Sequence, residues 1–135
     1  MPTTTYTPFA LLQHFSALRQ QTLQLTEGLT AEDMLLQSMP DASPTKWHLA
    51  HTTWFFEEFL LSQSDTHYKP FDPEFRYLFN SYYESVGARH QRPLRGMLSR
   101  PSLDNVLRYR DHINEQTLAL IDGPGKDNQL FLQTL

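Results

Sequence analysis

The stretch SPTKWHLAHTTWFFEEFLL, residues 43–61, decides how this chain folds. Ser43 is a typical N-cap residue, and Pro44 suits the first helical position, where its missing N–H costs nothing. Five side chains then recur at intervals of four, three, four and three residues: Trp47, His51, Trp54, Glu58 and Leu61. This spacing is typical of the seam of a helix that packs in a bundle. We therefore predict a helix from Ser43 to about Gln63 whose seam faces a bundle core.

The rest of the chain is also predicted to be helical, because no run of alternating apolar and polar residues is long enough to indicate a sheet. Helices are expected at 8–26, 31–37, 73–85 and 102–121, and a further helical pattern opens in the last segment, KDNQLFLQTL. Thr30 and Asp33 have the spacing of a capping box at the start of the second helix. A long ordered loop rich in arginine is expected up to Pro101. The fold class is therefore all-α, in one domain that spans residues 1–135.

The apolar periodicity also predicts which helix faces are buried. In the first helix, the inward positions are expected to be Phe9, Leu12, Phe15, Leu18 or Arg19, Thr22 and Leu25. In the helix at 102–121, they are expected to be Leu103, Val106, Leu107, Ile113 and Leu118.

Composition excludes several classes of function. The chain has 135 residues, a net charge of −4 and no cysteine. The acidic balance argues against a general nucleic-acid binder, and the lack of cysteine excludes disulfide or thiolate chemistry by this chain. The N-terminal residues do not have the pattern of a signal peptide, and no apolar run approaches the length of a membrane span. We therefore expect a soluble cytoplasmic protein without a nucleic-acid or membrane partner.

His51 is the first candidate site residue, because its place in the seam points it inward. Side chains on facing helices of a bundle can build a metal site, so His51 is a candidate ligand. A buried histidine that is hydrogen-bonded to a carboxylate or to the backbone is the alternative. Glu58 is then either the partner of His51 or one end of a salt bridge. No pair four residues apart, as a complete helical metal site would need, occurs among His14, His67, His90 and His112.

The second candidate site is the segment GARHQRPLRGMLSR, residues 87–100. It carries four arginines and no acidic residue: Arg89, Arg92, Arg95 and Arg100. Guanidinium groups suit a carboxylate or phosphate ligand. The alternative is a solvated loop whose arginines pair with surface carboxylates. The nearby aromatic residues are expected to pack in the core and anchor the loop rather than form a cation cage: Phe71, Phe75, Tyr77, Phe79, Tyr82 and Tyr83.

Both candidate sites lie in stretches that resemble a known family. DASPTKWHLAHTTWFFEEFLL (41–61) and YKPFDPEFRYLFNSYYESVGARHQRPLRGMLSRPSLDNVLRYRDHI (68–113) resemble the N-terminal DinB-like domain of the ergothioneine-biosynthesis sulfoxide synthases. The resemblance implies a DinB-like four-helix bundle and a non-haem Fe(II) enzyme. Such an enzyme uses oxygen to join γ-glutamylcysteine or cysteine to N-α-trimethylhistidine as a sulfoxide. It further implies that His51 is one of three iron ligands and that Arg89 and Arg92 hold the carboxylates of the thiol substrate.

The chain departs from this family at its end. The other two iron ligands of the family lie in an H-x-x-x-H motif on the last helix of the domain, and no such motif occurs up to Leu135. We therefore expect an incomplete fourth helix and a chain that is catalytically silent alone, with Fe(II) bound in the full-length protein but not retained here. The unfinished bundle is expected to self-associate. The alternative function is a stand-alone DinB-like module that binds a small anionic thiol or a protein partner without catalysis.

Overall fold

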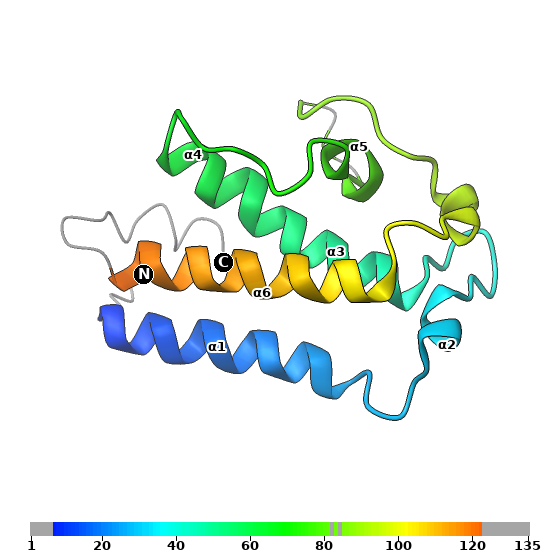
Figure 1. Ribbon diagram of the computed structural model, residues 1–135, viewed down its shortest axis with the longest axis horizontal. Coiled ribbons are helices and arrows are strands. Elements are labelled where there is room, and N and C mark those ends of the chain that lie inside the picture. Colours follow the sequence, from blue (N-terminus) through cyan, green and yellow to red (C-terminus); the bar gives the residue numbers. More distant parts are fainter. Residues whose placement is uncertain (1–6, 82, 84, 123–135) are drawn as a thin grey trace, which may run out of the picture.

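The computed structural model describes residues 7–81, 83 and 85–122. Three long helices form its body: α1 (Pro8–Gln24), α3 (Thr45–Phe56) and α6 (Leu103–Asp122). They lie side by side, and α6 packs against both α1 and α3 (Figure 1). Within the described residues there is no β-strand, only a single bridge between Met39 and Ala42. The predicted all-α bundle is confirmed, whereas the segment predicted as its last helix lies outside the described residues.

Helix α1 begins where the sequence predicts but buries a different face. Thr7 caps it by accepting a hydrogen bond from the Ala10 amide at 3.1 Å, and Pro8 lies in its first turn. Its buried side chains are Leu11, Phe15 and Arg19. Phe9 and Leu25 are 68% and 79% exposed. The prediction that they point inward is wrong, because the face with a spacing of four residues packs against the bundle.

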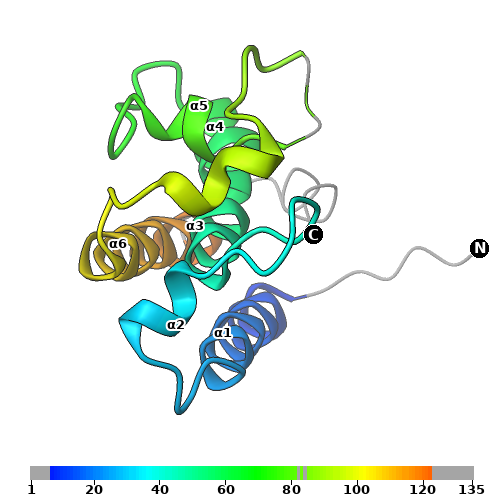
Figure 2. The same ribbon diagram turned by 90° about the vertical axis from the view of Figure 1, so that its right-hand side faces the viewer.

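Helix α2 (Ala31–Leu35) starts with the predicted capping box. The Asp33 amide donates to Thr30 Oγ1 at 3.1 Å, and the Thr30 amide donates to Asp33 Oδ2 at 2.8 Å. The helix ends two residues before the predicted end. Gln37 lies beyond it and instead contacts the 3-10 helix η2 (Arg92–Met97), which lies at the same end of the bundle (Figures 1 and 2).

Helix α3 begins one residue later than the sequence predicts. Pro44 is its N-cap, and the Pro44 carbonyl accepts a hydrogen bond from the His48 amide at 3.2 Å. Ser43 does not cap the helix, because its hydroxyl accepts a hydrogen bond from Arg95 Nη1 at 2.9 Å. A residue predicted to start a helix therefore fastens the arginine-bearing loop to it.

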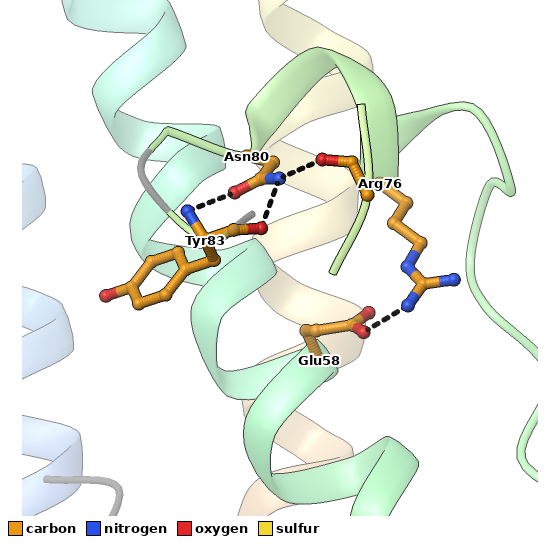
Figure 3. Close-up of polar contacts among 5 residues, drawn as sticks. Glu58, Arg76, Asn80 and Tyr83 are labelled. Atoms are coloured by element: carbon orange, nitrogen blue, oxygen red, sulfur yellow. Dashed lines mark hydrogen bonds and ion pairs between the residues drawn. The ribbon is translucent and has the colours of Figure 1, made fainter. Parts of the chain in front are cut away.

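The helix continues past Phe56 as a π-helical turn, η1 (Glu57–Leu61), and ends with α4 (Ser62–Ser64). The buried face of α3 continues into this turn without a break, because Ala50, Trp54, Glu57 and Leu61 are all buried at spacings of four, three and four residues. Glu57 is the buried carboxylate, only 5% exposed. Glu58 instead forms an ion pair with Arg76 at 3.1 Å (Figure 3). The prediction that Glu58 points inward is wrong, and its alternative role in a salt bridge is the observed one.

Glu57 joins the π-turn to two other parts of the chain. Its Oε1 accepts a hydrogen bond from Tyr109 Oη at 2.8 Å, and its Oε2 accepts from Tyr68 Oη at 2.7 Å and from the Phe71 amide at 3.1 Å. Burial and the Glu57 carboxylate raise the pKa of both tyrosines. Both hydroxyls therefore stay protonated and act as donors to Glu57.

The segment predicted as a helix at 73–85 is helical only over α5 (Phe75–Phe79). Asn80 follows with extended backbone, φ −70° and ψ 143°. The prediction was too long because side chains from other elements take up the carbonyls at the end of this helix. The predicted packing of the aromatic residues is confirmed for Phe75 and Phe79, which are buried, whereas Tyr77 is 46% exposed. Tyr82 lies outside the described residues.

Helix α6 matches its predicted range and part of its predicted face. Val106 and Ile113 are buried as expected, and Leu103 and Leu118 pack against the core. The periodicity missed several other buried residues of this helix: Tyr109, Arg110, Thr117 and Ile121. No described helix combines the length and the apolar character needed to cross a membrane.

Candidate functional site

The last turn of α5 receives two aromatic side chains of α3. Trp47 Nε1 donates a hydrogen bond to the Leu78 carbonyl at 2.9 Å. His51 Nδ1 lies 2.6 Å from the Phe79 carbonyl oxygen. A carbonyl only accepts, so Nδ1 carries the hydrogen in this bond. These contacts fix the orientation of the candidate metal ligand.

The next two carbonyls of the same segment receive arginines from the predicted anion site. Arg95 Nη2 donates to the Asn80 carbonyl at 3.3 Å, and Arg89 Nη1 donates to the Ser81 carbonyl. We call residues 78–81 the carbonyl segment, because its successive carbonyl groups bind the side chains of both candidate sites.

The Asn80 side chain shapes the turn that follows the carbonyl segment (Figure 3). Its Nδ2 donates to the carbonyls of Tyr83 and Gly87 at 3.1 and 3.3 Å, and its Oδ1 accepts from the Tyr83 amide at 3.2 Å. Gly87 has φ +135°, a conformation that favours glycine. Asn80 therefore places the loop that carries Arg89.

His51 is held as a neutral imidazole. Its ring stacks on Trp47 with 4.6 Å between centroids and on Trp54 with 5.6 Å. Burial lowers the pKa of His51, the hydrogen bond to Phe79 opposes this shift, and the charges of His48 and Arg95 lower the pKa further. With Nδ1 protonated, Nε2 carries a lone pair that can bind a metal ion.

One imidazole is not a complete metal site. Among the described residues, no group of three or more His, Cys, Asp or Glu side chains could hold a metal ion. His51 can therefore act as one ligand, but residues 7–81, 83 and 85–122 do not supply the full ligand set that iron needs.

The arginines of the second candidate site surround one hollow of about 560 Å³. Its lining residues are Asp41, Ser81, Arg89, Gln91, Arg92, Pro93 and Arg95, and we call it the arginine hollow. Arg100 lies outside it and donates to the Ser99 carbonyl at 3.1 Å. His51 does not line the arginine hollow but a separate groove between α1 and α3. The structure thus brings Arg89 and Arg92 together around one hollow and leaves His51 outside it.

Arg95 connects the two candidate sites. It is buried, and its guanidinium carbon lies 3.6 Å from the centre of the Trp47 ring. The same indole also stacks on His51, as described above. The alternative of a wholly solvated arginine loop is therefore wrong for Arg95. The sequence did not distinguish this arginine from the other three.

Two polar side chains hold the arginine-bearing loop in place, and the sequence analysis missed both. Gln37 Nε2 donates to the Arg92 carbonyl at 2.8 Å, and Gln37 Oε1 accepts from the Gly96 amide at 2.6 Å. Lys46 Nζ donates to the carbonyls of Leu98 and Pro101 at 2.9 and 2.8 Å. Both partners are distant in sequence, so no local pattern signals these contacts. The loop is nevertheless fixed at several points.

Comparison with known proteins agrees with an all-α bundle. The profile of the DinB superfamily matches residues 14–130. The chain belongs to the DinB superfamily. No curated protein matches it. In this DinB domain, α3 carries the candidate ligand His51, the carbonyl segment orients it, and the loop around η2 carries the arginines.

Proposed function

We propose that this DinB domain is the iron- and thiol-binding part of a non-haem iron sulfoxide synthase. The enzyme would join γ-glutamylcysteine or cysteine to N-α-trimethylhistidine with oxygen, in ergothioneine biosynthesis. Superfamily membership alone does not specify this activity. The proposal rests on the sequence resemblance over residues 41–113 and on the arrangement of His51, Arg89 and Arg92.

The observation that carries the proposal is the carbonyl segment. Phe79 and Ser81, whose carbonyls bind His51 and Arg89, are two residues apart. Two residues of chain span at most roughly 7 Å, so the candidate ligand and the candidate substrate arginine are anchored as close neighbours. A thiol substrate fixed by its carboxylates at the arginines would thus lie near a metal bound at His51.

The arginine hollow has the charges that an amino-acid-derived thiol requires. Arg89 and Arg92 offer guanidinium groups to carboxylates. Asp41 lines the same hollow and offers a carboxylate to an ammonium group. γ-Glutamylcysteine and cysteine each carry both kinds of group. This combination favours an amino-acid ligand over inorganic phosphate, which has no ammonium group for Asp41.

Bound iron would supply oxygen activation, but the described residues give it one ligand only. The remaining ligands must come from outside the described residues, so no step through iron follows from the part of the chain that the structure describes. What the chain itself does is bind and orient the thiol substrate and present His51 Nε2. We therefore expect no sulfoxide formation by the isolated chain.

Calorimetric titration with γ-glutamylcysteine tests the thiol site. We expect Arg89→Met and Arg92→Met each to weaken binding about tenfold, because each variant removes a charge-assisted hydrogen bond. Arg100→Met is the matched control, since Arg100 lies in the same loop but outside the arginine hollow. Equal affinities in the wild type and in both hollow variants, or no binding by the wild type, would refute the assignment.

A second titration, with ferrous ion under argon, tests whether the chain alone can hold iron. The proposal predicts no saturable binding at micromolar metal, because one histidine does not hold Fe(II) tightly. Saturable binding that is lost in His51→Ala would show that the chain, or a second copy of it, supplies the missing ligands.

A further inference from the structure

Arg95 differs from the other two arginines of the arginine hollow. It is 3% exposed, whereas Arg89 is exposed and Arg92 is half-buried. Its Nη1 donates to Ser43 Oγ at 2.9 Å, and its Nη2 donates to the Asn80 carbonyl at 3.3 Å. The protein therefore holds this guanidinium group on two sides, while the other two reach further into solvent.

The backbone on both sides of Arg95 is also fixed. Gln37 accepts a hydrogen bond from the Gly96 amide at 2.6 Å and donates one to the Arg92 carbonyl at 2.8 Å. Figure 1 shows that η2, which carries Arg95, lies beside the start of α3. The fold itself, without a ligand, therefore defines where this side chain meets α3.

The indole ring of Trp47 lies between Arg95 and His51. The guanidinium carbon of Arg95 is 3.6 Å from the centre of this ring, and the His51 ring is stacked on it at 4.6 Å with 12° between the planes. Arg95 reaches the chain at Ser43, four residues before Trp47, whereas His51 follows four residues after it. The two groups therefore lie on opposite faces of the indole, and the guanidinium group makes a cation–π contact there.

The three side chains of this stack also share one support. They bind three successive carbonyls of the carbonyl segment, which pair as Trp47 with Leu78, His51 with Phe79 and Arg95 with Asn80. Movement of the indole would disturb both its stack with the imidazole and its own hydrogen bond. The orientation of the His51 ring therefore depends on the contacts that hold Trp47, and Arg95 provides the contact on its far face.

We propose that Arg95 is a positioning residue: through Trp47 it holds the His51 ring so that Nε2 is presented to a metal ion, and it does not itself bind the thiol substrate. The roles of the metal and the thiol rest on the proposed function, whereas the stack exists in the metal-free chain. Contacts that orient a metal-ligating histidine typically contribute about 10–100-fold to metal affinity or activity. Of the arginines that line the hollow, Arg89 and Arg92 bind the substrate and Arg95 orients the ligand.

The test measures hydrogen exchange at side-chain N–H groups of the metal-free chain by ¹⁵N–¹H NMR. In Arg95→Met, we expect His51 Nδ1–H and Trp47 Nε1–H to exchange at least about tenfold faster, because two hydrogen bonds and a ring contact no longer oppose local opening. The backbone amides of α6 should keep their wild-type rates, which a general loss of stability would not allow. Calorimetry should show the affinity for γ-glutamylcysteine falling less than about threefold. Arg100→Met is the matched control and should resemble the wild type in every measurement.

Ser43→Ala keeps the proposal testable if Arg95→Met does not fold. This variant removes one acceptor of Arg95 and leaves the start of α3 intact, because Ser43 does not cap the helix. We expect His51 Nδ1–H to exchange about threefold faster with unchanged thiol affinity.

Three results would overturn the proposal. They are unchanged exchange at His51 in the variants, an equal rise throughout α6, and a loss of thiol affinity in Arg95→Met as large as that in Arg89→Met. No thiol binding by the wild type would instead refute the proposed thiol site, and the exchange rates would still decide whether Arg95 positions His51.

Discussion

The hydroxyl group of Tyr109 offers a sharp test of the buried network around Glu57. Tyr109 Oη is the donor to Glu57 Oε1, whereas Oε2 has two donors, Tyr68 Oη and the Phe71 amide. Tyr109→Phe therefore leaves one oxygen of a buried carboxylate without its donor. Tyr68→Phe leaves each oxygen with one donor.

These contacts give different expected losses of stability. A hydrogen bond to a charged group contributes about 1.5–3 kcal/mol, and an unsatisfied buried acceptor adds to the loss. We expect Tyr109→Phe to lower the free energy of unfolding by about 2–3 kcal/mol. Tyr68 is half-buried, so water can replace its hydroxyl, and we expect a loss of about 1 kcal/mol from Tyr68→Phe.

Urea denaturation followed by the fluorescence of Trp47 and Trp54 measures both values. The double variant completes a cycle that isolates the coupling through Glu57. Equal losses in the two single variants, or a loss below about 0.5 kcal/mol for Tyr109→Phe, would refute the assigned network.

Three further predictions follow from the described contacts. Burial is the main cause of a lowered pKa at His48, His51 and His90, so the unfolded chain binds more protons than the folded chain near their ordinary pKa. The free energy of unfolding should therefore be at its full value above about pH 6.5 and fall below that pH. An unchanged urea midpoint from pH 7 to 5 would contradict this. In Gly96→Ala the new Cβ would lie 2.6 Å from Gln37 Cβ. We therefore expect the free energy of unfolding, measured by urea denaturation, to fall by about 1–3 kcal/mol and thiol binding to weaken. Wild-type behaviour in both measurements would contradict this. The exposed apolar face of α1 should cause self-association at micromolar concentration, which a monodisperse monomer in analytical ultracentrifugation would contradict.

The sequence predicted the helices well where the pattern is local. The Thr30–Asp33 capping box, the start of α1 and the range of α6 follow from short-range rules, and all are observed. The seam of α3 also held as far as Trp54. It failed at Glu58, although Leu61 is buried as predicted, because the buried face follows Trp54, Glu57 and Leu61 and Glu58 lies one residue off it.

The candidate site was only partly predictable, because its supports are distant in sequence. The cluster of arginines was visible as a charge pattern, and the structure places Arg89 and Arg92 around one hollow. The contacts of Gln37 and Lys46 with the loop depend on tertiary packing. The contacts of the carbonyls of 78–81 also depend on tertiary packing. The helix predicted over 73–85 would have used these carbonyls in its own hydrogen bonds. The metal-ligand role of His51 stays a prediction from resemblance.

The central claim is that this chain belongs to an iron-dependent sulfoxide synthase, and the most direct test is the length of the native protein. Mass spectrometry of the protein from its own cells would read the sequence past Leu135. The account predicts a longer product that contains an H-x-x-x-H motif soon after this residue, which would supply the ligands that His51 lacks. A native product that ends at Leu135 would contradict the enzyme claim and favour a binding module.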